Sequence, residues 1–595
     1  MPVRVRLLQF RPEKGAVDEN LTRIRRDVAA ASGQVDLLVL PETILSGYHV
    51  EGGIAEVARS VDQVLTGLGA PPPNAPDLVL GFYETGREGH FNSALYLEAG
   101  ADGWEVRHVH RKTFLPTYGV FQEARFVAPG LEIAAFDTRF GRMGLLVCEE
   151  LLHSICPTIL CLDGAETLIC LSATPVRGFR PGADLPGNLE RWDAAGRATA
   201  LEHGAHLLVV HLVGSEGGKL FAGGSVVHGP GGDVLARGPL FRDGAVDVIL
   251  DPSAVVRDRE RSPLLRDLRV MSPHLKRSWS AAELRSADRQ AGRVRDEPVS
   301  GGVRRVRKGG DTTAPHVPID PDDHSPLEVN AALLGEALVS FLRDEVVAKR
   351  GFTDVVVGVS GGVDSAVSLA LAVRALGPEH VHAFLLPYRT SSSDSLEDGR
   401  LVADSFGVGH RTIDITGAVD GYVESEEQEL STLRRGNVAA RVRSIVLWDQ
   451  SARLGALPLG TGNKSERLLG FYTWHADDAP PLNPLGDLLK TQVWALARHL
   501  EVPERVIEKA PTPDLVQGVS DEDELGVTYE IADRILHWTL LGIPPERLVE
   551  SGFDADAVAL VRHRLDGTHW KRHLPTVAMV SSTSIGDFYL RPVDY

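Results

Sequence analysis

One segment, SGGVDS at residues 360–365, has the residue types that a phosphate-binding loop needs. It follows the apolar run VVVGV and leads into SAVSLALAV, so a buried strand would deliver it to the first turn of a helix. Glycines let the backbone approach an anion, and the free N–H groups at a helix start point toward it. Ser360 and Ser365 add hydroxyl donors, and Asp364 is placed to meet a metal ion that neutralises phosphate charge. The lysine of a Walker A loop is missing, so ordinary γ-phosphoryl transfer is not favoured.

The loop resembles the pyrophosphate loop of the N-type ATP pyrophosphatases, which adenylate a carboxylate or carbonyl group and release pyrophosphate. Three later segments resemble the NAD synthetase family in order and spacing: LGTGNKSERLLGFYT (459–473), NPLGDLLKTQVWALARHL (483–500) and KAPTPDLVQGVSDEDELGVTYE (509–530). The resemblance covers nearly all of residues 328–595. It implies that MgATP adenylates the pyridine carboxylate of nicotinic acid adenine dinucleotide (NaAD), and that ammonia then displaces AMP to give NAD.

The resemblance also implies a set of site residues. The expected magnesium ligands are Asp364 and Glu466. The expected ATP contacts are Ser360, Gly361, Gly362, Asp364, Ser365, Thr461, Lys490 and Thr512. The expected NaAD contacts are Asn437, Arg441, Asp477 and Lys571, and Arg572 adjoins the last of them. The chain departs from the family pattern at Gly436, His475 and Val519, where the family has Glu, Tyr and Gln. These departures concern how the pyridine end of NaAD is bound.

Three residues in the first part of the chain could form a nucleophilic site. Glu42 follows the apolar run VDLLVLP, Lys112 lies in RKTFLPTYG, and Cys148 ends the run GLLVC. A thiolate is the reactive form of cysteine, and a neighbouring ammonium group or a carboxylate base helps to generate it. Taken singly, Cys148 would be an inert core cysteine, and Glu42 and Lys112 would be surface residues.

The segments LPET, RKTFLPTYG and LLVCEE resemble the nitrilase superfamily, whose Glu-Lys-Cys triad hydrolyses amides and nitriles in an αββα sandwich. The resemblance spans most of residues 1–250 and implies that Cys148 is the nucleophile, Glu42 the general base and Lys112 the stabiliser of the oxyanion. Glu123 would orient Lys112. The expected glutamine-binding residues are Tyr118, Glu123, Glu149 and Ser172, and the remaining cysteines, Cys156, Cys161 and Cys170, are expected in the core.

The elements that must position these residues follow from the apolar pattern. Continuous apolar runs such as VDLLVL, MGLLVCEE and HLLVVHLV are typical of strands buried on both faces of a layered α/β domain. After residue 328, helix, strand, helix and strand follow one another, which favours a doubly wound parallel sheet. We therefore expect an α/β protein with three regions. These are a nitrilase-like αββα domain over 1–256, a linker over 257–327, and a Rossmann-like synthetase domain of the adenine nucleotide alpha hydrolase type over 328–595.

The linker region has an unusual charge. Residues 257–308 hold 15 Lys and Arg against 7 Asp and Glu, in a chain of 595 residues with a net charge of −19. A basic arm for nucleic acid is one interpretation, and a tether that lies on acidic surfaces of its own protein is the one we favour. The acidic balance of the whole chain argues against a broad phosphate-binding surface.

Composition also bears on location. No stretch approaches about 18 consecutive apolar residues, so we expect no membrane span. The start of the chain, MPVRVRLLQF, reads as a strand and lacks the apolar core and cleavage site of a signal peptide. Four cysteines clustered between residues 148 and 170 are too few for a secreted disulfide framework, which favours the cytoplasm.

Both halves together resemble the glutamine-dependent NAD synthetases. The small-molecule partners would then be glutamine, ATP with Mg²⁺, and NaAD, and the family pairs through its synthetase domains into homo-oligomers. Three alternatives stay open at this point. They are an RNA-modifying ATP pyrophosphatase with a tRNA-gripping linker, a non-catalytic nucleotide sensor, and a synthetase whose idle amidase half leaves it dependent on external ammonia.

Overall fold

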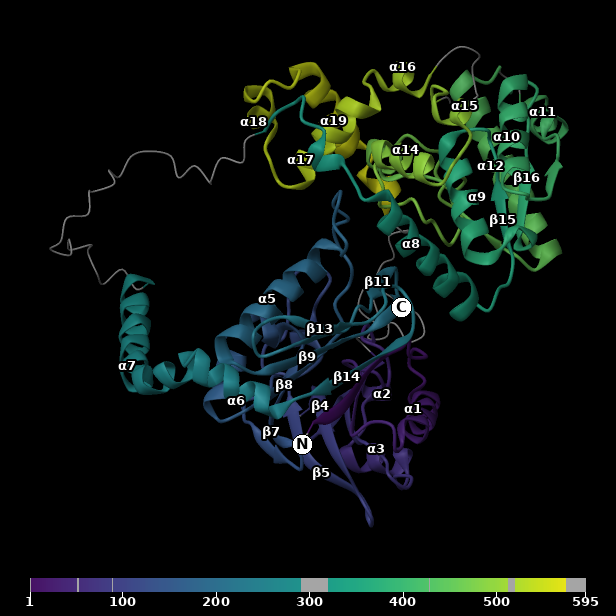
Figure 1. Ribbon diagram of the computed structural model, residues 1–595. Coiled ribbons are helices and arrows are strands. Elements are labelled where there is room, and N and C mark those ends of the chain that lie inside the picture. Colours follow the sequence, from purple (N-terminus) through teal and green to yellow (C-terminus); the bar gives the residue numbers. More distant parts are fainter. Residues whose placement is uncertain are drawn as a thin grey trace.

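The structure is a computed structural model. It describes residues 2–50, 53–87, 89–290, 319–426, 429–511 and 520–573. Two α/β bodies follow one another along the chain, the first in purple to blue and the second in green to yellow (Figure 1). In the part of the chain that the structure describes, every helix is too short or too polar to cross a bilayer.

The first body contains two six-stranded sheets. The first sheet has the order β14 (Gly244–Leu250), β1 (Val3–Gln9), β2 (Leu37–Val39), β3 (Asp77–Gly86), β4 (Gly89–Gly100) and β5 (Gly103–Arg111). The second sheet has the order β13 (Val234–Arg237), β12 (Val226–His228), β9 (His206–His211), β8 (Thr167–Ser172), β7 (Gly141–Val147) and β6 (Phe136–Thr138). One apolar core joins residues of both sheets, so the sheets pack face to face.

Helices cover the two outer faces of this sandwich. On the first sheet, α1 (Val17–Ala31) and α3 (Val61–Leu68) bury their apolar faces. On the second, α4 (Ile155–Leu162) and α5 (Gly187–His203) do the same. The central strands β7, β8 and β9 pair in parallel, and every residue of β8 is buried, as expected for a strand covered on both faces. The predicted αββα sandwich is confirmed.

The second body is built on a four-stranded, fully parallel sheet. Its order is β17 (His410–Thr412), β16 (Val381–Leu385), β15 (Val355–Gly358) and β18 (Leu457–Pro458). On one face lie α8 (Ala331–Leu342), α9 (Val363–Leu376), α10 (Ser393–Ser405) and α14 (Lys490–His499), and on the other α11 (Thr416–Val423) and α12 (Thr432–Leu454). Because β15 pairs with β16 on one side and β18 on the other, the chain reverses its winding there. This doubly wound parallel sheet is the predicted fold.

A smaller helical layer completes the second body. It is formed by α13 (Lys464–Leu469), α17 (Tyr529–Leu540), α18 (Pro545–Glu550) and α19 (Ala555–Gly567), which share an apolar cluster of their own. The short helix α16 (Asp521–Leu525) precedes α17. Tyr529 is fully buried in this cluster and packs edge-on against Trp494 of α14, which ties the layer to the sheet.

The basic region after residue 256 is partly helical. Helix α6 (Pro252–Arg261) leads into α7 (Leu264–Gln290), which projects from the first body (Figure 1). Arg259 donates hydrogen bonds to the carbonyls of His203 and Ala165, and Arg269 donates to that of Cys161. These arginines therefore bind backbone carbonyls of their own chain. Residues 291–318, which include all the glycines of the expected linker, lie outside the described residues, and the expected domain limits remain predictions.

The two bodies are in direct contact. An apolar cluster joins Leu189, Ala222 and Phe241 of the first body to Leu333 and Ala337 of α8. Nearby, the Ser340 hydroxyl donates to the carbonyl of Phe241 over 3.0 Å. The hairpin of β10 (Val213–Glu216) and β11 (Lys219–Ala222) belongs to the first body and also contacts α8.

Candidate active sites

The three residues expected to form a nucleophilic site follow strand ends in both sheets of the sandwich. Glu42 comes three residues after β2, Lys112 directly after β5, and Cys148 directly after β7. Gly81 on β3 makes room for the first of them, because a Cβ there would lie 2.6 Å from the Cα of Glu42. Cys148 itself has a φ of 51°, a left-handed conformation that costs energy for a residue other than glycine and is often found at active sites.

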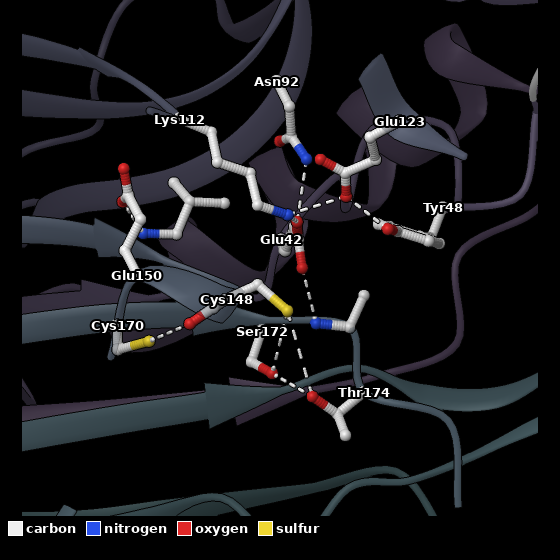
Figure 2. A network of polar contacts seen from close by, with 12 residues as sticks. Glu42, Tyr48, Asn92, Lys112, Glu123, Cys148, Glu150, Cys170, Ser172 and Thr174 are labelled. Atoms are coloured by element: carbon white, nitrogen blue, oxygen red, sulfur yellow. Dashed lines mark hydrogen bonds and ion pairs between the residues drawn. The ribbon is translucent and has the colours of Figure 1, made fainter. Parts of the chain in front are cut away.

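The ammonium group of Lys112 lies between two carboxylates (Figure 2). Its Nζ is 2.9 Å from Oε1 of Glu42 and 2.7 Å from Oε1 of Glu123, and all three side chains are buried. Glu42 also accepts hydrogen bonds from Asn92 Nδ2 at 2.8 Å and from the backbone N–H of Ala173 at 2.7 Å. These hydrogen bonds offset part of the free-energy cost of removing the Glu42 carboxylate from water. They also hold this carboxylate in one orientation.

Cys148 lies beside this ion cluster. Ser172 Oγ is 3.9 Å from its sulfur and Thr174 Oγ1 is 4.0 Å away, and the two hydroxyls are 2.9 Å apart. Burial, and after it the charge of Glu42, raises the pKa of the Cys148 thiol to about 12, although Lys112 opposes the rise. The resting side chain is therefore a protonated thiol, which needs a base before it can attack a carbonyl carbon.

The electrostatics of the cluster keep the lysine charged. Burial alone would lower the pKa of Lys112, but the carboxylates of Glu123 and Glu42 outweigh it and hold that pKa well above its usual value. Burial raises the pKa of Glu123 to about 7, and Lys112 limits that rise. The cluster thus presents a fixed positive group next to the thiol, where a negative charge would develop on an attacked carbonyl oxygen.

The structure divides the expected glutamine-binding residues into two groups. Ser172 lies against the sulfur, whereas Glu123 is occupied by Lys112 and by the Tyr48 hydroxyl, so its contacts are those of an orienting residue. Tyr118 is 57% exposed and hydrogen-bonds to Glu149, so this pair lies near solvent.

Sequence reasoning missed three residues of this site: Asn92, Thr174 and Tyr48. Asn92 reaches Glu42 because β4 pairs with β3, with Asn92 opposite Tyr83, on the side of the sheet where β2 delivers Glu42. Tyr48 reaches Glu123 across 75 residues of sequence. Thr174 is two residues after Ser172, so the expected strand end could have indicated it.

The second candidate site begins at the phosphate-binding loop. β15 ends at Gly358 and α9 begins at Val363, so SGG forms the turn between them, as predicted. Gly361 has a φ of +81°, and a Cβ there would lie 2.2 Å from the carbonyl oxygen of Ser395. Only glycine fits this position, because both the backbone conformation and the neighbouring backbone exclude a side chain.

Three charged side chains meet at the start of α9. Lys490 Nζ lies 2.5 Å from Oδ2 of Asp364 and 3.5 Å from Oε1 of Glu466, and Asn463 Nδ2 donates to Oδ1 of Asp364 at 3.0 Å. Burial and the charge of Asp364 raise the pKa of Glu466 to about 8, against the effect of Lys490. Burial also raises the pKa of the nearby Asp521 to about 6.

These residues border a cleft of about 1250 Å³. Its lining includes the following expected site residues: Ser360, Gly362, Asp364, Ser365, Thr461, Glu466, Lys490, Asn437, Asp477, Lys571 and Arg572. Gly361 faces the backbone of α10, and Arg441 lies off the lining, where it donates to the carbonyl of Trp474. Thr512 and Val519 fall outside the described residues. The tertiary fold therefore brings residues that span more than 200 positions of sequence into one cavity.

Two of the three departures from the family pattern, Gly436 and His475, lie in the described part of the chain. Gly436 lines the cleft directly. His475 has a φ of 61° and its ring packs on Trp474, with ring centroids 3.9 Å apart. Sequence reasoning missed Lys509, which lines the cleft and donates to Asp398 Oδ2 at 2.9 Å, although it opens the segment KAPTPDL.

Comparisons with known proteins identify both bodies. A family model described as carbon-nitrogen hydrolase matches residues 4–260, and one described as NAD synthase matches residues 334–575. An NH(3)-dependent NAD(+) synthetase from Chlorobaculum parvum is 44% identical over 273 residues, which cover 45% of this chain and 95% of that protein. Another from Trichlorobacter lovleyi is 45% identical over 262 residues, covering 44% of this chain and 95% of that one.

Two solved structures resemble the whole chain. The glutamine-dependent NAD+ synthetase from Acinetobacter baumannii, in complex with adenosine diphosphate, has a TM-score of 0.70 at 23% identity and covers 100% of this chain and 98% of its own. That from Cytophaga hutchinsonii has a TM-score of 0.66 at 15% identity and covers 96% and 93%. At these identities the likeness shows a common fold and domain order. The sequence relatives go further: this chain belongs to the NAD synthetase family of carbon–nitrogen ligases, which act in the last step of NAD biosynthesis, and it carries a carbon-nitrogen hydrolase domain on the N-terminal side.

Proposed function

We propose that the chain is a glutamine-dependent NAD synthetase. Its first half hydrolyses glutamine to glutamate and ammonia, and its second half adenylates NaAD with MgATP and then amidates it, releasing AMP and pyrophosphate. The observation that carries the proposal is the buried cluster of Glu42, Lys112 and Glu123 beside Cys148. A synthetase that took ammonia only from solution would have no use for a desolvated ion cluster next to a thiol, because such a cluster costs free energy to bury.

The first half-reaction is assigned to the residues around the thiol. The Glu42 carboxylate takes the proton of Cys148, and the thiolate attacks the side-chain amide carbon of glutamine. The fixed ammonium of Lys112 stabilises the oxyanion of the tetrahedral intermediate. Protonated Glu42 then gives its proton to the departing nitrogen, and the remaining glutamyl thioester is hydrolysed by water that the same carboxylate activates. Ser172 with Thr174 on one side of the sulfur, and Tyr118 with Glu149 nearer to solvent, would hold the substrate.

In the second half, the cleft suits MgATP and a dinucleotide. Asp364 and Glu466 would hold Mg²⁺, whose ordinary ligands are one or two carboxylates together with phosphate oxygens, and the ion would neutralise charge on the pyrophosphate leaving group. In the described part of the chain, no three His, Cys, Asp or Glu side chains are arranged to bind a metal.

Donors around the loop would hold the phosphates. They are Ser360, Ser365, Thr461 and Lys490, together with the backbone N–H groups at the start of α9. Thr512 remains a predicted phosphate contact. Lys490 is well suited to the leaving pyrophosphate, because Asp364 and Glu466 keep its pKa above the usual value in spite of burial, so it stays charged. The proposed NaAD contacts are Asn437, Arg441, Asp477 and Lys571.

Joining the two activities in one chain has a chemical reason. Only neutral ammonia has the lone pair that attacks an adenylate, and at neutral pH most ammonia in water is protonated. Release of ammonia in a linked half of the same molecule raises its effective concentration at the second site. We further propose that the enzyme is cytoplasmic and assembles through its synthetase domains. Its four cysteines are free and buried, which suits a reducing compartment.

The test uses two nitrogen sources. In Cys148→Ala, NAD formation driven by glutamine should disappear, while formation driven by ammonium chloride should persist, because the second cleft does not contain Cys148. Cys161→Ala is the matched control, since that cysteine is equally buried but lies on α4 away from the ion cluster. Survival of glutamine-driven synthesis in Cys148→Ala would show that the amidase assignment is wrong, and would favour an enzyme that depends on external ammonia.

A further inference from the structure

One hairpin of the first body reaches both candidate sites. Glu216 ends β10 and pairs with Lys219 at the start of β11, so Gly217 and Gly218 form the two-residue turn. Both glycines have positive φ, 54° and 77°, as a type I′ turn requires. The same two glycines line the large cleft of the second body. The tip of the hairpin therefore borders the synthetase site, although the hairpin belongs to the amidase half.

At the base of the turn, Glu216 clamps a loop of the amidase site. Its buried carboxylate accepts hydrogen bonds from the backbone N–H of Tyr48 at 3.0 Å and from that of His49 at 2.7 Å. Gly47 permits this approach, because a Cβ there would lie 2.8 Å from Glu216 Oε1. Hydrogen bonds to a charged acceptor are about twice as strong as neutral ones, so the Tyr48–His49 backbone has a fixed position.

The clamped residue is connected to the catalytic cluster. The Tyr48 hydroxyl donates to Oε1 of Glu123, and this oxygen also accepts from Lys112 Nζ at 2.7 Å (Figure 2). The ring is buried, and Tyr83 donates to the carbonyl of Tyr48 at 2.7 Å. Backbone placement of Tyr48 thus determines where its hydroxyl meets Glu123. Glu123 in turn fixes the ammonium group beside the thiol.

The second body holds the same hairpin. The Ser215 hydroxyl donates to Glu345 Oε1 at 2.6 Å, and Glu345 also accepts from Lys349 at 2.9 Å and from Arg350 at 2.6 Å. Glu345 lies in a π-helical turn (Arg343–Ala348), a feature often found at functional sites. Glu345, Lys349 and Arg350 all line the synthetase cleft. A series of polar contacts therefore connects that cleft with the amidase site: Glu345 binds Ser215, and the adjacent Glu216 binds the Tyr48–His49 backbone.

We propose that Glu216 is a positioning residue for amide hydrolysis, acting through Tyr48 on the Glu123–Lys112 pair, and that Glu345 of the synthetase half holds its hairpin in place through Ser215. The inference rests on the proposed glutamine hydrolysis at Cys148. The amidase half would then be fully ordered for catalysis only while it is docked on the synthetase half.

The first experiment uses Glu216→Gln in the full chain, which keeps the size of the side chain and removes its charge. We expect kcat for glutamine hydrolysis to fall about 10- to 100-fold with KM within about twofold, since a misplaced catalytic group costs rate rather than ground-state binding. Asp77→Asn is the matched control, because Asp77 is a buried carboxylate that also accepts a backbone N–H but lies at the start of β3. Ammonium-driven NAD formation, unchanged in both, shows that the chain is folded.

A double-mutant cycle tests the route. If Glu216 acts through Tyr48, Glu216→Gln should add less than twofold to the loss already caused by Tyr48→Phe. Effects that multiply, or a Glu216→Gln enzyme within twofold of wild type, would overturn the proposal. For the interdomain contact, Ser215→Ala should lower kcat for glutamine about three- to tenfold, as expected for one lost hydrogen bond. Ser340→Ala, which loses a different hydroxyl contact between the bodies, should leave kcat for glutamine unchanged. Equal effects of the two variants would overturn the proposed role of the Ser215–Glu345 contact.

A second readout separates this inference from the proposed function. The rate at which iodoacetamide alkylates Cys148, followed by peptide mass spectrometry, needs no glutamine turnover. Lys112 lowers the pKa of this thiol, so displacement of the ammonium group in Glu216→Gln should slow alkylation several-fold. If the wild-type protein hydrolyses no glutamine, the proposed function fails, and the alkylation rates alone then decide whether Glu216 positions the cluster.

Discussion

Replacement of Lys112 by methionine should expose how the amidase half balances its buried charges. The variant keeps the length of the side chain but leaves the carboxylates of Glu42 and Glu123 facing each other without a cation. Removal of one partner from a buried ion pair typically costs about 3–5 kcal/mol. For a body of about 250 residues, this corresponds to a fall of roughly 6–20 °C in the melting temperature of its transition.

The loss should also depend on pH with a definite sign. Burial raises the pKa of Glu123 to about 7 while Lys112 opposes the rise, so removal of Lys112 moves that pKa higher. A carboxyl group whose folded pKa exceeds its unfolded value stabilises the fold below the unfolded value, and this contribution is lost as pH rises through the folded pKa. The deficit of Lys112→Met should therefore be largest at pH 8.5 and shrink toward pH 5.5, by about 1.4 kcal/mol for each unit of additional pKa shift.

Differential scanning calorimetry at pH 5.5 and pH 8.5 measures both effects. Lys464→Met is the control, because Lys464 pairs with Asp487, which is 94% exposed, and such surface pairs contribute about 0–1 kcal/mol. The control should melt within about 4 °C of wild type at both pH values. A Lys112→Met protein that melts like the control, or one whose deficit is the same at the two pH values, would refute the account of this cluster.

Two further predictions concern the synthetase half. Gly361→Ala should destabilise the second body by at least about 1–2 kcal/mol because of its left-handed φ alone, and the contact of the new Cβ with the Ser395 carbonyl should add to this loss. The control Gly362→Ala should melt near wild type, because its Cβ would meet only a side-chain oxygen at 3.4 Å. Equal melting temperatures of the two variants would contradict this prediction. Asp364→Asn should abolish NAD formation from glutamine and from ammonium alike, while glutamine hydrolysis continues. Chelation of divalent cations should have the same effect on the wild-type enzyme. If Asp364→Asn still forms NAD from either nitrogen source, Asp364 is not a metal ligand.

Much of the architecture could be predicted from the sequence. Continuous apolar runs indicated strands covered on both faces, and the structure shows β8 buried at every residue. The turn after β15 was predicted because paired glycines between a buried strand and a helix start permit a tight turn that can approach an anion. Gly361 indeed occupies a conformation that side chains avoid. The helix α7 was not expected. The linker prediction followed from glycine and proline content, which is concentrated after residue 290, whereas residues 264–290 hold one proline.

The candidate sites were predicted less completely. Glu42 and Cys148 were predicted because each lies at the end of an apolar run and matches a known motif, and Lys112 because its segment matches one. Asn92 and Tyr48 could not, because neither has a motif, and their contacts depend on how β4 pairs with β3 and on the path of a loop. Glu216 is a similar case. Its neighbours in sequence suggest an ordinary hairpin, and its role depends on a backbone segment about 170 residues earlier.

By itself, the sequence determined which chemical groups the protein possesses and which local segments present them, because strand, turn and helix propensities act over a few neighbouring residues. Only the tertiary structure decided which of those groups share a desolvated space. The pKa of Glu123, the protonated state of Cys148 and the contact between Ser215 and Glu345 all arise from charges and dipoles that are distant in sequence but only a few ångströms apart in the fold. Coulombic and desolvation energies depend on that separation and on burial, and neither can be read from the order of residues.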